Sequence, residues 1–153
     1  MSTAARGDDQ HPGQPPGGVN VDPKIKTVQA VYAAFGTRDV EVILNLVTDD
    51  IDWASDAEAT GVVPWYGVHK GKAELLNFFK ATGESTEVTE FTPLGFAAGE
   101  IEAMSVVRYG FTVRSHGRSG TMQIHHWWRF RGDLIEQYRG SEDTELTTRL
   151  FSA

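Results

Sequence analysis

Residues 120–131 alternate between apolar and polar side chains along most of their length. Successive side chains of a β-strand point to opposite faces, so this alternation predicts a strand with one apolar face. That face would carry Met122, Ile124, His126, Trp128 and Phe130, and the opposite face Gln123, His125, Trp127, Arg129 and Arg131. His126 therefore lies in an otherwise apolar row. A histidine in such a row is either a hydrogen-bonded core residue or a proton-transfer group in a pocket.

Helical spacing characterises the first half of the chain. Apolar residues recur every three or four positions in three segments, which predicts helices at 25–36, 40–47 and 71–83. Thr37 or Asp39 is expected to cap the second helix, and Gly83 to end the third.

Strand patterns replace the helical period after residue 83. A short strand is predicted at 51–55 and longer ones at 86–98, 101–114, 120–131 and 134–140. Residues 56–64 resemble a loop, and Ser141 is expected to cap a short C-terminal helix. Helices first and antiparallel strands afterwards indicate an α+β domain, with the helices packed on one face of a curved antiparallel or mixed sheet.

Composition limits the class of protein. The chain has 153 residues, of which 40% are hydrophobic, so it can bury one core of ordinary size. Residues 1–22 are rich in proline and glycine and are predicted to be a disordered tail, which leaves 23–153 as the domain. A net charge of -7 disfavours nucleic acid as a partner, and the absence of cysteine excludes disulfides and thiolate chemistry.

The sequence also predicts where the protein is found and how it assembles. It contains no apolar run long enough to span a membrane and no signal peptide pattern, so a cytoplasmic location is expected. Both faces of the predicted sheet carry apolar residues, and a second subunit is the simplest cover for the face without helices. We therefore expect a homodimer through the convex face, with His125 and Trp127 in the interface.

Three segments support a resemblance to a known family: VQAVYAAFGTRDVEVILNLVTDDIDW at 28–53, GKAELLNFF at 71–79 and HHWWRFRGDLIEQYR at 125–139. Together with the order of elements, they resemble the SnoaL-like branch of the nuclear transport factor two-like superfamily over about residues 25–145. The resemblance implies a cone-shaped α+β domain whose open end is a small-molecule pocket. It also implies a dimer that needs no cofactor.

The ketosteroid isomerases of this superfamily provide one catalytic pattern for comparison. They use a carboxylate base with a tyrosine and a protonated aspartate as oxyanion donors. An ungapped comparison places the base at Ser55, next to Asp56, and the tyrosine at Val31, next to Tyr32. It places the protonated aspartate at His126. One position therefore keeps a proton-handling side chain of another type, and the others miss by one residue.

The limonene epoxide hydrolases provide a second pattern, an Arg-x-Asp pair on one strand and an aspartate on the last strand. The corresponding positions here are Arg108, Gly110 and Gly140. The arginine is retained, but glycine replaces both carboxylates and cannot remove a proton. The epoxide hydrolase mechanism is therefore excluded.

Four residues are the predicted catalytic groups. His126 would handle a proton, Asp56 would be a base, and Arg108 or Tyr32 would polarise or orient a ligand. Arg108 appears among apolar neighbours, so its guanidinium would need either an acidic partner or an anionic ligand. No metal site is expected, because adjacent histidines on a strand diverge.

Several further residues are predicted to bind the ligand. Most are aromatic and suit a planar apolar molecule, and two are polar. The predicted binding set is Trp53, Ser55, Trp65, Tyr66, Phe79, Tyr109, Trp128 and Asp143. Asp143 has an alternative interpretation, because acidic residues after Ser141 also suit the first turn of a helix.

Two functions follow from these observations. The first is a cofactor-free isomerase, cyclase or dehydratase that acts by acid/base chemistry on a hydrophobic carbonyl compound. The second is a ligand-binding or assembly module that keeps the fold without the chemistry. An enzyme pocket should bring at least two polar groups within reach of one ligand atom, whereas a binding module needs only apolar walls.

Overall fold

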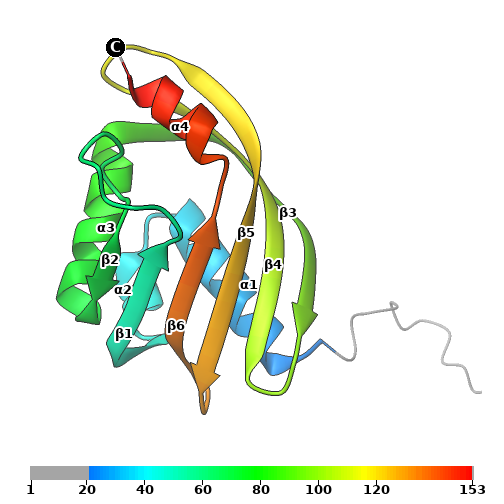
Figure 1. Ribbon diagram of the computed structural model, residues 1–153. Coiled ribbons are helices and arrows are strands. Elements are labelled where there is room, and N and C mark those ends of the chain that lie inside the picture. The colour runs from blue at the N-terminus through cyan, green and yellow to red at the C-terminus, as the bar shows by residue number, and fades with distance from the viewer. Residues whose placement is uncertain (1–20, 153) are drawn as a thin grey trace, which may run out of the picture.

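The computed structural model describes residues 21–152. Its elements follow the order α1(Pro23–Gly36), α2(Val40–Leu44), β1(Val47–Ser55), β2(Val68–Lys70), α3(Gly71–Ser85), β3(Thr86–Ala98), β4(Glu102–Val113), β5(Ser119–Arg131), β6(Leu134–Ser141) and α4(Thr144–Phe151). The strands form one mixed sheet in the order β2-β1-β6-β5-β4-β3. All pairs are antiparallel except β1 with β6, which are parallel. The predicted α+β fold is confirmed (Figure 1).

Local sequence signals explain how the helices begin. The Asp22 carboxylate accepts a hydrogen bond from the Lys24 backbone N–H at 2.8 Å, and Pro23 occupies the first turn, where its missing N–H costs nothing. Asp39 caps α2 in the same way. Asp22 belongs to the segment 1–22 that was predicted to be a disordered tail, but the structure describes it as the cap of α1. Residues 1–20 of that segment lie outside the described part of the chain.

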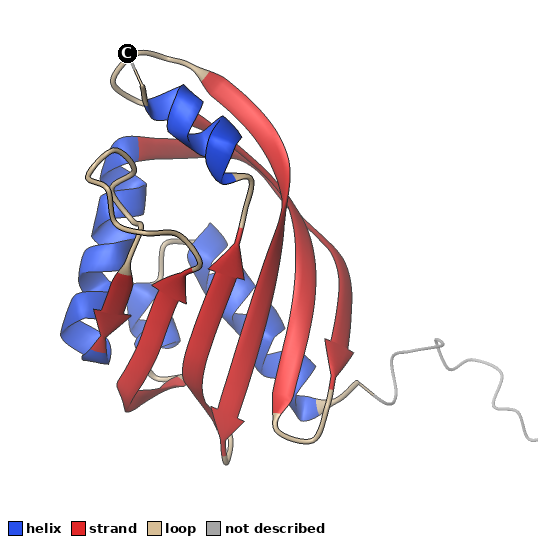
Figure 2. Ribbon diagram, viewed as in Figure 1, coloured by secondary structure: helices blue, strands red, loops and turns tan. Residues whose placement is uncertain are grey.

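The sheet curves over the helices, as Figure 2 shows. Helices α1, α2 and α3 cover its concave face, and α4 closes one end. Strand β5 alternates between buried and exposed residues from Thr121 to Arg131, which confirms the predicted faces. His126 is 9% exposed on the inner face, whereas Trp127 is 42% exposed on the outer face. The side chains on the inner face build the core together with the helices.

Several details differ from the sequence predictions. The helix predicted at 40–47 ends at Leu44, and β1 begins at Val47, four residues before the predicted strand, because Val47 pairs with Ile135 of β6. Strand β2 was not predicted, because three residues that pair only with β1 leave almost no periodic signal. Helix α3 continues past Gly83 to Ser85, whose hydroxyl donates to the Ala81 carbonyl. Ser141 ends β6 and does not cap α4, because the cap is Asp143.

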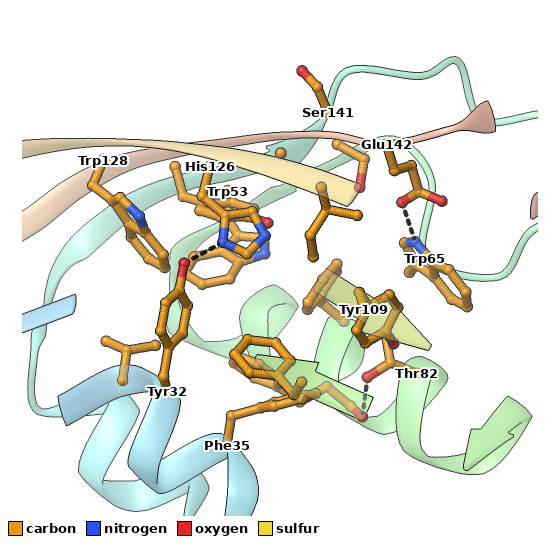
Figure 3. A pocket seen from close by; sticks show the side chains of 18 residues that line it. Tyr32, Phe35, Trp53, Trp65, Thr82, Tyr109, His126, Trp128, Ser141 and Glu142 are labelled. Carbon is orange, nitrogen blue, oxygen red and sulfur yellow. Dashed lines mark hydrogen bonds between the residues drawn. The ribbon is translucent and has the colours of Figure 1, made fainter. Parts of the chain in front are cut away.

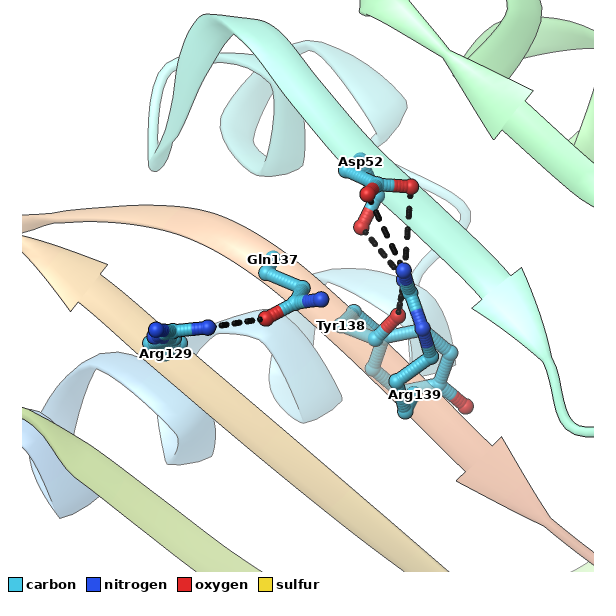
Figure 4. Close-up of polar contacts among 5 residues, drawn as sticks. All are labelled: Asp52, Arg129, Gln137, Tyr138 and Arg139. Carbon is cyan, nitrogen blue, oxygen red and sulfur yellow. Dashed lines mark hydrogen bonds and ion pairs between the residues drawn. The ribbon is translucent and has the colours of Figure 1, made fainter.

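Within residues 21–152, no helix packs on the outer face of the sheet (Figures 1 and 2). Polar pairs cross this face, including an ion pair between Arg139 and Asp52 at 3.0 Å and a hydrogen bond from Arg129 to Gln137 at 2.9 Å (Figure 4). The helices of the described residues are all too short or too polar to cross a membrane.

Candidate active site

A cavity of about 90 Å³ lies between α1, α3 and the concave face of the sheet, and we call it the inner cavity. Aromatic rings form most of its wall: Tyr32, Phe35, Trp53, Trp65, Phe78, Phe79, Phe91, Tyr109, Trp128 and Tyr138. Its polar side chains are few: Ser55, Thr82, His126, Ser141 and Glu142. Figure 3 shows His126 and Glu142 entering the cavity from the sheet side, with Tyr32 and Phe35 opposite on α1.

A buried hydrogen-bond network holds His126 in place. The Tyr32 hydroxyl lies 2.6 Å from His126 Nδ1 and 2.5 Å from Ser105 Oγ. Trp128 Nε1 donates to the same serine oxygen at 3.1 Å. Strand β4 supplies Ser105, and strand β5 supplies His126 and Trp128. Ser105 and His126 lie side by side because they are cross-strand partners. Helix α1 supplies the fourth and fixes the distance between helix and sheet.

The donors available in this network determine the direction of each hydrogen bond. The indole N–H of Trp128 can only donate, so Ser105 Oγ accepts from it and directs its own proton to Tyr32. Tyr32 then donates to His126 Nδ1, and the histidine proton resides on Nε2. The opposite direction would leave the Ser105 proton without an acceptor in a buried site, which is costly. His126 is therefore a neutral imidazole with an Nε2–H donor.

Burial keeps this imidazole neutral. Removal from water and, to a smaller extent, the nearby His125 lower the pKa of His126 from 6.5 to about 3. Burial also raises the pKa of Tyr32 above its usual range, although the polar groups of Ser105 and Trp128 near its hydroxyl oppose that change. Both side chains therefore stay uncharged at neutral pH, and His126 can donate a hydrogen bond without first losing a charge.

This pKa difference predicts a pH dependence of stability. The unfolded chain binds a proton at His126 below pH 6.5, but the folded chain does so only near pH 3, so stability falls as the pH is lowered through this window. Each pH unit should cost up to about 1.4 kcal/mol. We expect His126→Phe to remove this part of the loss. Urea unfolding of both proteins between pH 4 and 7 measures the difference, and parallel curves would contradict it.

Glu142 is a partly buried carboxyl at the other side of the cavity. Its oxygens accept hydrogen bonds from Thr147 at 2.6 Å, Tyr66 at 3.1 Å and Trp65 at 3.2 Å. Burial raises the pKa of Glu142 above its usual range, while these three donors partly oppose the rise. A carboxylate whose pKa moves toward neutrality is a stronger base than a solvated one. Glu142 can therefore accept a proton inside the cavity.

A stacked pair of rings forms the floor between these two groups. Trp53 and Tyr138 lie 3.9 Å apart at an interplanar angle of 22°. The Tyr138 hydroxyl occupies the space that a side chain at Gly140 would fill. Among the described residues, Trp53 Nε1 is a buried donor without a hydrogen-bond partner. Such groups are rare in folded proteins.

The structure brings together most of the residues predicted for the site. The inner cavity is lined by Tyr32, Trp53, Ser55, Trp65, Phe79, Tyr109, His126 and Trp128. Tyr66 lies behind this wall and donates to Glu142. The isomerase comparison placed a tyrosine one residue from Tyr32, and the structure joins the Tyr32 hydroxyl to His126.

Three predicted residues lie elsewhere. Arg108 is 60% exposed and pairs with Glu90 at 3.1 Å, so its guanidinium has an acidic partner, one of the two expected alternatives, but it is not buried and lies outside the cavity. Asp56 is exposed outside the cavity and accepts a hydrogen bond from Ser141 at 3.0 Å. Asp143 is also exposed, and its carboxylate caps α4 through the Leu146 N–H at 3.0 Å. The structural interpretation of Asp143 is therefore correct.

The sequence analysis missed three polar groups of the site, Ser105, Tyr138 and Glu142, and also the lining rings Phe35, Phe78 and Phe91. A signal for two of them was present, because alternation along β6 places Tyr138 and Gly140 on the inner face. Extending this period by two residues places Glu142 inside and Asp143 outside. Ser105 carried no such signal, because serine is common on both faces of a strand. Among residues 21–152, no cluster of three or more His, Asp or Glu could hold a metal ion.

Known proteins first identify the class of fold. A nuclear transport factor two-like protein of unknown function from Burkholderia pseudomallei is 23% identical, and the match covers 87% of this chain and all of that chain with a TM-score of 0.79. TerC, crystallised with polyporic acid, is 22% identical over 86% of this chain and all of its own, with a TM-score of 0.74. These similarities establish the nuclear transport factor two-like fold.

The family is narrower than the fold. The SnoaL-like domain matches residues 28–138, which is most of the chain, and the protein belongs to this family. A protein from Xanthomonas campestris, assigned provisionally as a polyketide cyclase, is 13% identical, with 85% of this chain and 97% of that chain covered and a TM-score of 0.69. No curated protein matches the sequence.

Proposed function

We propose that the inner cavity is the active site of a cofactor-free enzyme that moves a proton on an apolar carbonyl compound, as in isomerisation, cyclisation or dehydration. One observation carries this proposal: a neutral buried histidine and a partly buried carboxyl with a raised pKa share one aromatic cavity. Buried titratable groups with shifted pKa values that line the same pocket are typical of acid/base sites.

His126 would bind the carbonyl oxygen of the ligand. Its Nε2–H donates to that oxygen, and the hydrogen bond strengthens as negative charge develops there during enolisation. Tyr32 fixes the tautomer through Nδ1, in the way that a second hydrogen bond usually orients a catalytic imidazole. The unpartnered N–H of Trp53 is a second candidate donor to the ligand. Low polarity around these groups makes each donor more effective.

Glu142 would take the proton from the carbon next to the carbonyl. The carboxylate is held by Thr147, Tyr66 and Trp65, so it does not need to reorganise before it reacts. Returning the proton to another carbon completes an isomerisation. Attack of the enolate on a second carbonyl of the ligand forms a carbon–carbon bond and an alkoxide, and return of the proton from Glu142 to that alkoxide completes a cyclisation. The assignment of a related structure as a polyketide cyclase supports a ligand rich in carbonyl groups.

Deuterium exchange tests the proposal without knowledge of the natural substrate. The protein is mixed with 2-pentanone in D₂O, and the loss of the hydrogens next to the carbonyl is followed by ¹H NMR. We expect exchange that is faster than in buffer and saturates with ketone. Binding without faster exchange would instead favour the alternative function, a ligand-binding module with the same fold.

The homodimer through the outer face of the sheet remains a prediction. The outer face carries Trp127 and, opposite it on β4, Met104 with 49% exposure. Pairing of two copies would bury both side chains. We expect a dimer at micromolar concentration in sedimentation equilibrium, and Trp127→Ala should weaken it more than Trp128→Ala. A monomer would contradict this, as would a stronger effect of Trp128→Ala.

A further inference from the structure

The inner cavity is small compared with ordinary ligand sites. Pockets for small organic molecules usually measure about 300–1,000 Å³, whereas the inner cavity measures about 90 Å³. Its polar groups are His126 and Glu142 at the sheet side, with aromatic rings around them (Figure 3). A compact group such as a carbonyl and its neighbouring carbons fits there. The rest of a larger ligand must lie elsewhere.

A second space adjoins the inner cavity, and we call it the outer groove. It measures about 600 Å³ and lies between α1 and α2 on one side and α3 and β3 on the other. The side chains that line both spaces are Tyr32, Phe35, Phe79, Thr82 and Phe91. A single layer of side chains therefore separates the two spaces.

Three phenylalanine rings form most of this partition. The ring centroids of Phe35 and Phe91 are 5.4 Å apart, and those of Phe35 and Phe79 are 6.3 Å apart. All three rings are only partly buried, unlike the core rings beneath them. A ring at the edge of a core changes rotamer more readily than one packed on all sides. Rotation of these rings would join the groove to the cavity.

The chemistry of the groove favours an uncharged apolar occupant. Its floor consists of Ala34, Val40 and Ile43 together with the phenylalanine partition. Its charged lining residues are two cations, Arg38 and Lys80, and two anions, Glu84 and Glu87. These charges cancel, so the groove provides no preference for an anionic or cationic tail.

We propose that the outer groove binds the apolar arm of an elongated ligand whose carbonyl head occupies the inner cavity. The arm passes between Phe35, Phe79 and Phe91. This inference rests on the proposed function, because that function places the carbonyl beside His126. It identifies the ligand class as a compact carbonyl group with an uncharged alkyl or aryl arm.

A pair of ketones separates the two spaces. 2-Pentanone supplies a head of the size of the inner cavity, and 2-nonanone adds four methylene groups. Each buried methylene should tighten binding about fourfold, so 2-nonanone should bind on the order of 100-fold more tightly. Affinities are measured by NMR titration of the folded full-length chain. Equal affinity for both ketones would overturn the proposal.

The chain has no cysteine, so a single introduced cysteine can be labelled selectively to block the groove at one position. Val88 lines the groove and is 39% exposed, so Val88→Cys can be labelled with N-phenylmaleimide. Unlabelled Val88→Cys is the first control. Labelled Ile101→Cys, in the turn between β3 and β4 and outside both spaces, is the second, because Ile101 is 52% exposed. Urea unfolding verifies that each labelled protein is still folded.

We expect the label at position 88 to weaken 2-nonanone binding at least tenfold and to leave 2-pentanone binding within twofold. An equal effect on both ketones, or no effect on either, would overturn the proposal. So would a change in oligomeric state caused by this label, because the groove would then be a protein interface. If the label weakens 2-nonanone binding but no sample exchanges deuterium, the proposed function is wrong. The groove would then still be the site of the apolar arm.

Discussion

Glu142→Gln is expected to slow deuterium exchange of a bound ketone at least 100-fold. General base catalysis by one side chain usually contributes a factor of about 10²–10⁴, and an amide cannot accept the proton. The substitution keeps the size of the side chain, and the glutamine amide can still form hydrogen bonds with Trp65, Tyr66 and Thr147. Ketone affinity should therefore change little. The measurement is the exchange rate at saturating 2-pentanone.

The neighbouring acid provides a matched control. Asp143 is exposed, and Asn is as good a helix cap as Asp, so Asp143→Asn should exchange at the rate of the unmodified protein. Equal loss of exchange in both variants would show that the effect comes from α4 and not from the Glu142 carboxylate. Full activity of Glu142→Gln would remove Glu142 from the mechanism.

Trp128→Ala should cause the largest loss of stability of any single change considered. Trp128 is 1% exposed, and its ring contacts Tyr32, Trp53 and Tyr138. Removing a buried aromatic side chain usually costs about 3–5 kcal/mol. The substitution also removes the indole N–H that donates to Ser105, so the chain of hydrogen bonds from Ser105 through Tyr32 to His126 loses its first donor.

Urea unfolding at one fixed protein concentration measures this loss. Trp127→Ala is the control, because Trp127 is adjacent in sequence but lies on the outer face, where it donates to Glu102. We expect less than half the effect from that change. A larger loss for Trp127→Ala would mean that the outer face contributes more to stability than the inner cavity wall does.

The inner face of β5 could be predicted because one strand imposes a strict period of two. That period placed His126 and Trp128 on one face and Trp127 on the other. The same rule, applied to β4, would have placed Arg108 outside, since Ser105 and Val107 are inside. The error came from judging burial by sequence neighbours, which in a strand face the opposite side.

Other parts of the site depend on long-range packing. The contact between Tyr32 and His126 joins residues 94 positions apart, and no local pattern encodes it. The partition of Phe35, Phe79 and Phe91 combines two helices and an edge strand. Each ring follows an ordinary apolar pattern in its own element. Only the relative placement of these elements reveals two adjoining spaces on either side of the rings.

Deuterium exchange by His126→Phe tests the central claim most directly. Phenylalanine keeps the volume and apolar character of the site but removes the Nε2–H donor. We expect this variant to fold and to bind 2-pentanone within a few fold of the original affinity. It should exchange the hydrogens of the ketone at least 100-fold more slowly. Unchanged exchange and unchanged affinity would contradict the claim, because His126 would then be a residue of the core alone.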